Sequence, residues 1–170
     1  LLNVKEFKNK TICHSGNFSF TDQHNDDKKY LVEKIKFLFD KDVKSTILFL
    51  SGHGQIDNEG LSYFCIESYG KVERLYYLEV YSLWSNRNNK DTHKDLLIII
   101  DSCHSGGWVE ENISHKHSDI MIQASCSKDQ KSTDLCYEEA KGGILIYNLN
   151  CLNKNNRSKI VENKKQTPVY

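Results

Sequence analysis

Two continuous runs of apolar or β-branched residues dominate the hydrophobic pattern of the chain, residues 46–50 (TILFL) and residues 96–100 (LLIII). Neither run alternates apolar with polar positions, and each ends at small or polar residues. Such runs are typical of interior strands of a parallel sheet, whereas a buried helix would need a longer segment. The pattern therefore predicts two central strands with both faces buried.

Apolar residues at the spacing of a helix lie before and after these runs. Apolar residues at positions 31, 35, 38 and 39 predict a helix over residues 30–39, with Asp26 and Asp27 as candidate N-caps. The same spacing predicts helices over residues 77–84 and 145–152. Residues 120–124 predict a third strand, and weaker strand patterns lie at residues 11–13 and 61–66. Alternating strands and helices predict an α/β fold, a helix–sheet–helix sandwich with right-handed crossovers.

Composition narrows the class of protein. The 170 residues fit one domain. Because 23 basic residues balance 23 acidic ones, nucleic acid is not an expected partner. No apolar run approaches the roughly 20 residues of a membrane helix, and no signal peptide opens the chain. We therefore expect no membrane partner, a cytoplasmic location, and six cysteines that remain free thiols.

The candidate chemistry follows the two strongest strands, as residues 51–54 (SGHG) and residues 101–107 (DSCHSGG). Functional groups of open α/β sheets gather beyond the carboxyl ends of the strands. If these strands are neighbours, the imidazole of His53 meets the thiol of Cys103, the minimal pair of base and nucleophile. The backbone N–H groups of Gly54 and Cys103 would then bind a developing oxyanion.

Each of these residues has a simpler interpretation when taken alone. A buried cysteine after a strand is usually a small hydrophobic residue, and a histidine in a glycine-rich loop is usually a turn residue. Their joint occurrence at two strand ends favours the functional interpretation. His104 is the rival base, but side chains adjacent in sequence diverge at a strand end. No metal site is predicted, because the chain has no CxxC pair and no clear ligand cluster.

Residues 48–54 (LFLSGHG) and 101–106 (DSCHSG), with the His 50 residues before the Cys, resemble the caspase-like peptidases. The DSCHSG form is similar to the metacaspases rather than to true caspases. The resemblance covers residues 30–170 and implies the caspase-haemoglobinase fold with a mostly parallel sheet. It also implies one peptidase domain over residues 1–170. The family's first strand is not recognisable in residues 1–29, so the domain is expected to be N-terminally incomplete.

The resemblance implies a cysteine endopeptidase that acts on protein or peptide substrates. His53 would be the general base and Cys103 the nucleophile. Ser51 and Asp101 would line a pocket for a basic P1 side chain, since a buried carboxylate pairs well with Arg or Lys. The alternative for Asp101 is a structural acceptor at the strand end. The alternative function is a non-catalytic caspase-fold module that binds or regulates partners.

Calcium is the cofactor that the resemblance suggests, because many metacaspases hold it with several acidic residues. This chain offers Asp57, Glu59 and Glu67 after the candidate base, and Glu110 after the candidate nucleophile. This acidic set is incomplete, so no metal ligand is assigned. The oligomeric state is not predicted.

Overall fold

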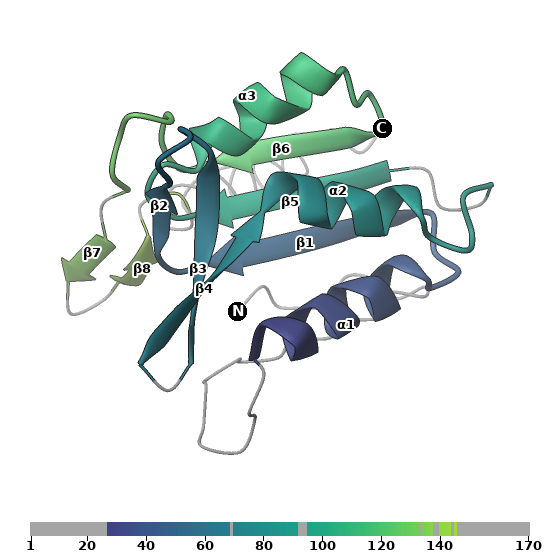
Figure 1. The fold of residues 1–170 in the computed structure, drawn as a ribbon, viewed down its shortest axis with the longest axis horizontal. Coiled ribbons are helices and arrows are strands. Elements are labelled where there is room, and N and C mark those ends of the chain that lie inside the picture. Colours follow the sequence, from purple (N-terminus) through teal and green to yellow (C-terminus); the bar gives the residue numbers. More distant parts are fainter. Residues whose placement is uncertain are drawn as a thin grey trace, which may run out of the picture.

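The computed structural model describes residues 27–68, 70–91, 95–132, 134–137, 140–143 and 145 (Figure 1). The expected strand at residues 11–13 lies outside the described residues, and so does the segment with the expected lack of a first strand, residues 1–29, except for its last three residues. The expected helix over residues 145–152 also lies outside them, except for Leu145.

Within the described ranges, the sheet that positions the candidate site has three parallel strands, β1 (Ser45–Ser51), β5 (Asp95–Asp101) and β6 (Ile120–Ala124). Their order is β1-β5-β6, so β5 lies between the other two. All three strands were predicted from the apolar runs. This arrangement, with the helices beside it, confirms the α/β class with a mostly parallel sheet.

In the part of the chain that the structure describes, three helices cover one face of this sheet (Figure 1): α1 (Asp27–Phe39), α2 (Tyr77–Ser85) and α3 (Gly106–His115). The predicted helices over residues 30–39 and 77–84 are confirmed as α1 and α2. Helices and sheet share one apolar core, in which Phe39 and Trp84 meet edge to face with ring centroids 5.3 Å apart. Its buried side chains are Leu31, Ile35, Phe39, Leu48, Leu50, Phe64, Ile66, Leu75, Tyr77, Val80, Trp84, Leu96, Ile98, Ile100, Trp108 and Ile120.

The expectation that both faces of the central strands are buried is wrong for β1. Leu48 and Leu50 are buried against the helices, but Ile47 is 65% exposed and Phe49 is 46% exposed. The reason is geometric, because successive side chains of a strand point to opposite faces and α1–α3 all pack on the face that carries Leu48 and Leu50. In β5, Leu97 is partly buried and Leu96 fully buried, so the central strand is closer to the expectation.

Antiparallel strands lie beside the main sheet. One small sheet has the order β2-β3-β4, formed by β2 (Gly54–Ile56), β3 (Ser62–Ser68) and β4 (Lys71–Tyr76). A separate hairpin pairs β7 (Asp134–Tyr137) with β8 (Ala140–Gly143). Of these strands, only β3 was expected. In the described part of the chain, no helix is long and apolar enough to span a bilayer.

The region where α2 and α3 meet carries a pH-sensitive histidine. The Tyr77 hydroxyl donates to Asn112 Oδ1 at 2.7 Å, and His117 Nδ1 lies 2.8 Å from the same hydroxyl. The His117 ring also stacks on Tyr81, with centroids 3.4 Å apart. Burial lowers the pKa of His117, and the nearby His115 lowers it further. The folded chain therefore favours the neutral ring.

We expect His117 to make folding less stable in mild acid. The unfolded histidine titrates near pH 6.5, so below that pH the unfolded chain binds more protons than the folded one. The free energy of unfolding should therefore fall as the pH drops from about 7.5 to 5.5. Urea unfolding of His117→Gln should show a smaller fall than the unsubstituted chain. An equal fall in both proteins would contradict this assignment.

Candidate active site

The candidate site lies where β1 and β5 end side by side. The parallel register places Ser51 opposite Asp101, and the Gly52 N–H donates to the Asp101 carbonyl at 3.1 Å. His53 and Cys103 each follow two residues later, on adjacent strand ends. The neighbouring strands that the sequence argument required are therefore present.

Gly54 ties the His53 segment to the Cys103 turn. A Cβ added to Gly54 would lie 2.2 Å from the Cys103 carbonyl oxygen and 2.8 Å from Ser102 Oγ. The two backbones thus approach to a distance that only a residue without a side chain tolerates. This contact places the candidate base segment directly against the candidate nucleophile turn.

The candidate base and nucleophile differ in how they are held. His53 is exposed, and its carbonyl accepts the Cys65 N–H at 2.8 Å, which fixes the backbone between β1 and β3. Cys103 is half-buried, and its thiol lies 3.8 Å from the Ser132 carbonyl oxygen as a weak donor. Cys65, Cys103 and Cys126, whose side chains the structure describes, are free thiols.

The two expected pocket residues lie at the paired strand ends. Asp101 is buried, and its Oδ1 accepts the Ser132 hydroxyl at 3.3 Å. Ser51, its neighbour in register, is exposed. Ser132 therefore contacts both Asp101 and Cys103. Sequence reasoning missed this residue, which lies in a polar loop 31 residues after Asp101.

Hydroxyl groups hold the turn that carries Cys103. Ser125 Oγ accepts the Ser102 N–H at 3.2 Å and donates to the Ser102 carbonyl at 3.1 Å. Ser105 Oγ accepts the Ser125 N–H at 3.2 Å. The main-chain groups of Ser102 are therefore fixed by the loop that follows β6. A Cβ at Gly106 would lie within 2.8 Å of the backbone at residues 126–128, so this loop packs tightly on the turn.

His104 points to the same loop. Its Nδ1 lies 2.7 Å from the Lys128 carbonyl oxygen. A carbonyl only accepts hydrogen bonds, so Nδ1 carries the proton and donates it. The Nδ1 face of this ring is thus directed to the β6–β7 loop. With Nδ1 bonded in this way, the ring is anchored to the loop, and His104 stays the rival of His53 for the role of base.

Trp108 is fully buried, and its Nε1 donates to the Ser62 carbonyl at 3.2 Å. The residue belongs to α3, whose first residues follow the Cys103 turn. It therefore supports the core under the site rather than a substrate groove.

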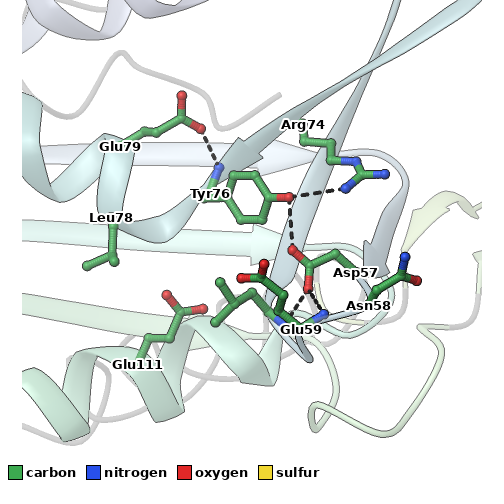
Figure 2. Close-up of a pocket in the computed structure, with 9 residues that line it drawn as sticks. Asp57, Asn58, Glu59, Arg74, Tyr76, Leu78, Glu79 and Glu111 are labelled. Carbon is green, nitrogen blue, oxygen red and sulfur yellow. Dashed lines mark hydrogen bonds between the residues drawn. The ribbon is translucent and has the colours of Figure 1, made fainter.

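An acidic pocket of about 510 Å³ lies beside the small sheet (Figure 2). Asp57 is the most constrained acid in it: Oδ1 accepts the N–H groups of Leu61 and Glu59 at 2.9 Å, and Oδ2 accepts the Tyr76 hydroxyl at 3.0 Å. These bonds, that of Leu61 foremost, lower the pKa of Asp57. The pocket is lined by Asp57, Asn58, Glu59, Leu61, Arg74, Tyr76, Leu78, Glu79 and Glu111.

Of the acids considered for calcium, those whose side chains the structure describes do not form a ligand set. Asp57 and Glu59 line the pocket, but Glu110 lies 3.7 Å from the Lys128 ammonium, and the side chain of Glu67 is outside the described residues. Within the described ranges, no three His, Cys, Asp or Glu side chains are placed to hold a metal ion together. Both oxygens of Asp57 accept hydrogen bonds from within the chain. No step of the chemistry below is assigned to calcium.

Comparison with known proteins identifies one matching family. The family model described as a caspase domain matches residues 14–165, which is most of the chain. This agrees with the α/β fold and with the sheet that positions the site. No curated protein matches the chain in sequence.

Proposed function

Because the chain belongs to the caspase domain family of cysteine peptidases, we propose that it is a metacaspase-like endopeptidase that cleaves after Arg or Lys. Its catalytic dyad is His53 and Cys103. The observation that carries the proposal is the parallel pairing of β1 with β5, which brings both motifs to one edge. The proposal takes residues 1–170 as one domain, acting on protein substrates in a reducing compartment.

The proposed mechanism uses groups at the two strand ends. His53 takes the proton of the Cys103 thiol, and the thiolate sulfur attacks the carbonyl carbon of the scissile peptide. The oxyanion that forms accepts hydrogen bonds from the N–H groups of Gly54 and Cys103. The imidazolium then gives its proton to the leaving amine, and a thioester remains on the sulfur. Water, deprotonated by His53, hydrolyses the thioester and releases the acid product.

The basic specificity rests on Asp101. Its carboxylate is buried at the end of β5, two residues before the nucleophile, and Ser51 lies beside it in register. A guanidinium or ammonium group next to this carboxylate would form a charge-assisted hydrogen bond, whereas an Asp side chain at P1 would be repelled. The DSCHSG form of the motif supports the metacaspase subtype over a true caspase.

The test is hydrolysis of short fluorogenic peptides with Arg, Lys or Asp at P1, with and without calcium. Cleavage after Arg or Lys that is lost in Cys103→Ala supports the proposal. Cleavage only after Asp keeps the dyad and overturns the pocket assignment. No cleavage of any peptide overturns the peptidase and favours the non-catalytic binding module.

The role of Asp101 makes a separate prediction. We expect Asp101→Asn to lower kcat/KM for the Arg peptide by about 10²-fold, because the buried partner of the P1 cation is removed. Asp95→Asn is the matched control, since Asp95 lies at the other end of the same strand, where it is exposed and bonded to Ser45 at 3.4 Å. A normal Arg-peptide rate in Asp101→Asn would assign Asp101 a structural role instead.

A further inference from the structure

We propose that His104 is a positioning residue for Cys103, an inference that rests on the proposed dyad. His104 has φ +60°, the left-handed region that residues with a Cβ rarely adopt. In the described part of the chain, Lys116 with φ +57° is the other non-glycine residue with a positive φ. Lys116 ends α3, where a left-handed cap is common, whereas His104 directly follows the nucleophile.

Two hydrogen bonds hold His104 in this conformation. Its backbone N–H donates to the Gln130 carbonyl at 2.9 Å, and its ring Nδ1 donates to the Lys128 carbonyl at 2.7 Å. Both acceptors are main-chain groups of the loop after β6, so these two hydrogen bonds do not depend on which side chains the loop carries. The ring bond and the backbone bond together offset the cost of the left-handed backbone.

The link from His104 to Cys103 is the peptide plane that the two residues share. On one side, this plane is fixed by the bond from the His104 N–H to Gln130. On the other side, the Cys103 carbonyl oxygen faces Gly54, where it leaves no room for a Cβ. A rotation at residue 104 would therefore move the Cys103 backbone against the His53–Gly54 segment. The ring of His104 resists that rotation from outside the site.

Three substitutions separate the backbone requirement from the ring bond. Asn tolerates the left-handed region and has an amide donor, Gly tolerates it without a donor, and Ala lacks both advantages. The first readout is the pH profile of Cys103 alkylation by iodoacetamide, followed on the Cys103 peptide by mass spectrometry. The second is the split of kcat and KM for the Arg peptide. A role confined to folding would shift the melting temperature and leave both readouts unchanged.

We expect both readouts to stay closest to those of the unsubstituted chain in His104→Asn. They should change more in His104→Gly and most in His104→Ala. His104→Ala should lower kcat about 10-fold or more with little change in KM, because the nucleophile is displaced rather than the substrate pocket. Its alkylation profile should depart from that of the unsubstituted chain. If His104→Ala does not fold, the comparison of Asn with Gly tests the ring bond by itself.

Lys116→Ala is the matched control, since it truncates the side chain at a left-handed position away from the site. It should leave the alkylation of Cys103 unchanged. The proposal is overturned if His104→Gly and His104→Ala keep the profile of the unsubstituted chain, or if Lys116→Ala shifts it equally. Alkylation needs no substrate, so it tests the role of His104 even if no peptide is hydrolysed. The absence of peptide hydrolysis would count only against the proposed peptidase function.

Discussion

Replacing His53 by alanine should lower the rate of peptide hydrolysis by about 10³-fold, because the Cys103 thiol loses its general base and the leaving amine loses its acid. Cys103→Ala should abolish the reaction. The double variant should be no worse than Cys103→Ala, because residues that act as a unit are not additive. The measurement is kcat for an Arg peptide, compared at equal amounts of folded protein.

Two controls accompany this experiment. His115→Ala removes an exposed imidazole at the end of α3, and Cys126→Ala removes a thiol of the loop after β6 that lies 3.4 Å from the Ser102 carbonyl. His115→Ala should leave kcat unchanged, and Cys126→Ala should affect it far less than Cys103→Ala. Full activity in His53→Ala, combined with a loss of about 10³-fold in the kcat of His104→Asn, would show that His104 and not His53 is the general base.

Gly54→Ala is the second substitution with a large expected effect. Its Cβ would lie 2.2 Å from the Cys103 carbonyl oxygen, a backbone atom, so the clash cannot be relieved by a side-chain rotation. The Cys103 turn is held on its other side by Ser125 and Gln130, so it has no free direction in which to retreat. We expect a loss of about 10²-fold in kcat/KM from misplacement of the nucleophile, with a stability loss of about 1–3 kcal/mol.

Gly60→Ala separates these two effects. Gly60 has φ +82°, so alanine is strained there, but a Cβ at this position meets no atom within 4 Å. This variant should lose stability in urea unfolding and keep its activity. If Gly54→Ala retains full activity, the backbone approach between the two motifs is not required for catalysis.

The apolar runs predicted the parallel strands correctly because burial in a sheet selects continuous β-branched and aliphatic residues. The same reasoning failed for the exposed face of β1, since Ile47 and Phe49 are as apolar as Leu48 and Leu50 and the pattern carries no sign of which face the helices cover. Strand β4 was missed for the opposite reason. Its sequence KVERLY is too polar to be recognised, and its pairing with β3 becomes visible only in the structure.

The motifs around the candidate dyad were recognisable because special residue types follow two strong strands. The residues that hold these motifs in place were not recognisable from the sequence. Ser125 and Ser132 act through hydrogen bonds to residues 23 and 31 positions away, and a hydroxyl in a polar loop looks like any other in the sequence. The left-handed backbone of His104 was also missed, since glycine or asparagine would be the usual signal for that conformation.

The dependence of the Cys103 turn on a later segment has a consequence for biosynthesis. A ribosome that has added residues only as far as α3 has already produced both His53 and Cys103. The groups that hold the turn, on Ser125, Lys128 and Gln130, are still to be translated. Products of premature termination before these residues would carry Cys103 without its support. The turn that carries Cys103 can thus be held in its described form once the residues that follow β6 have been added.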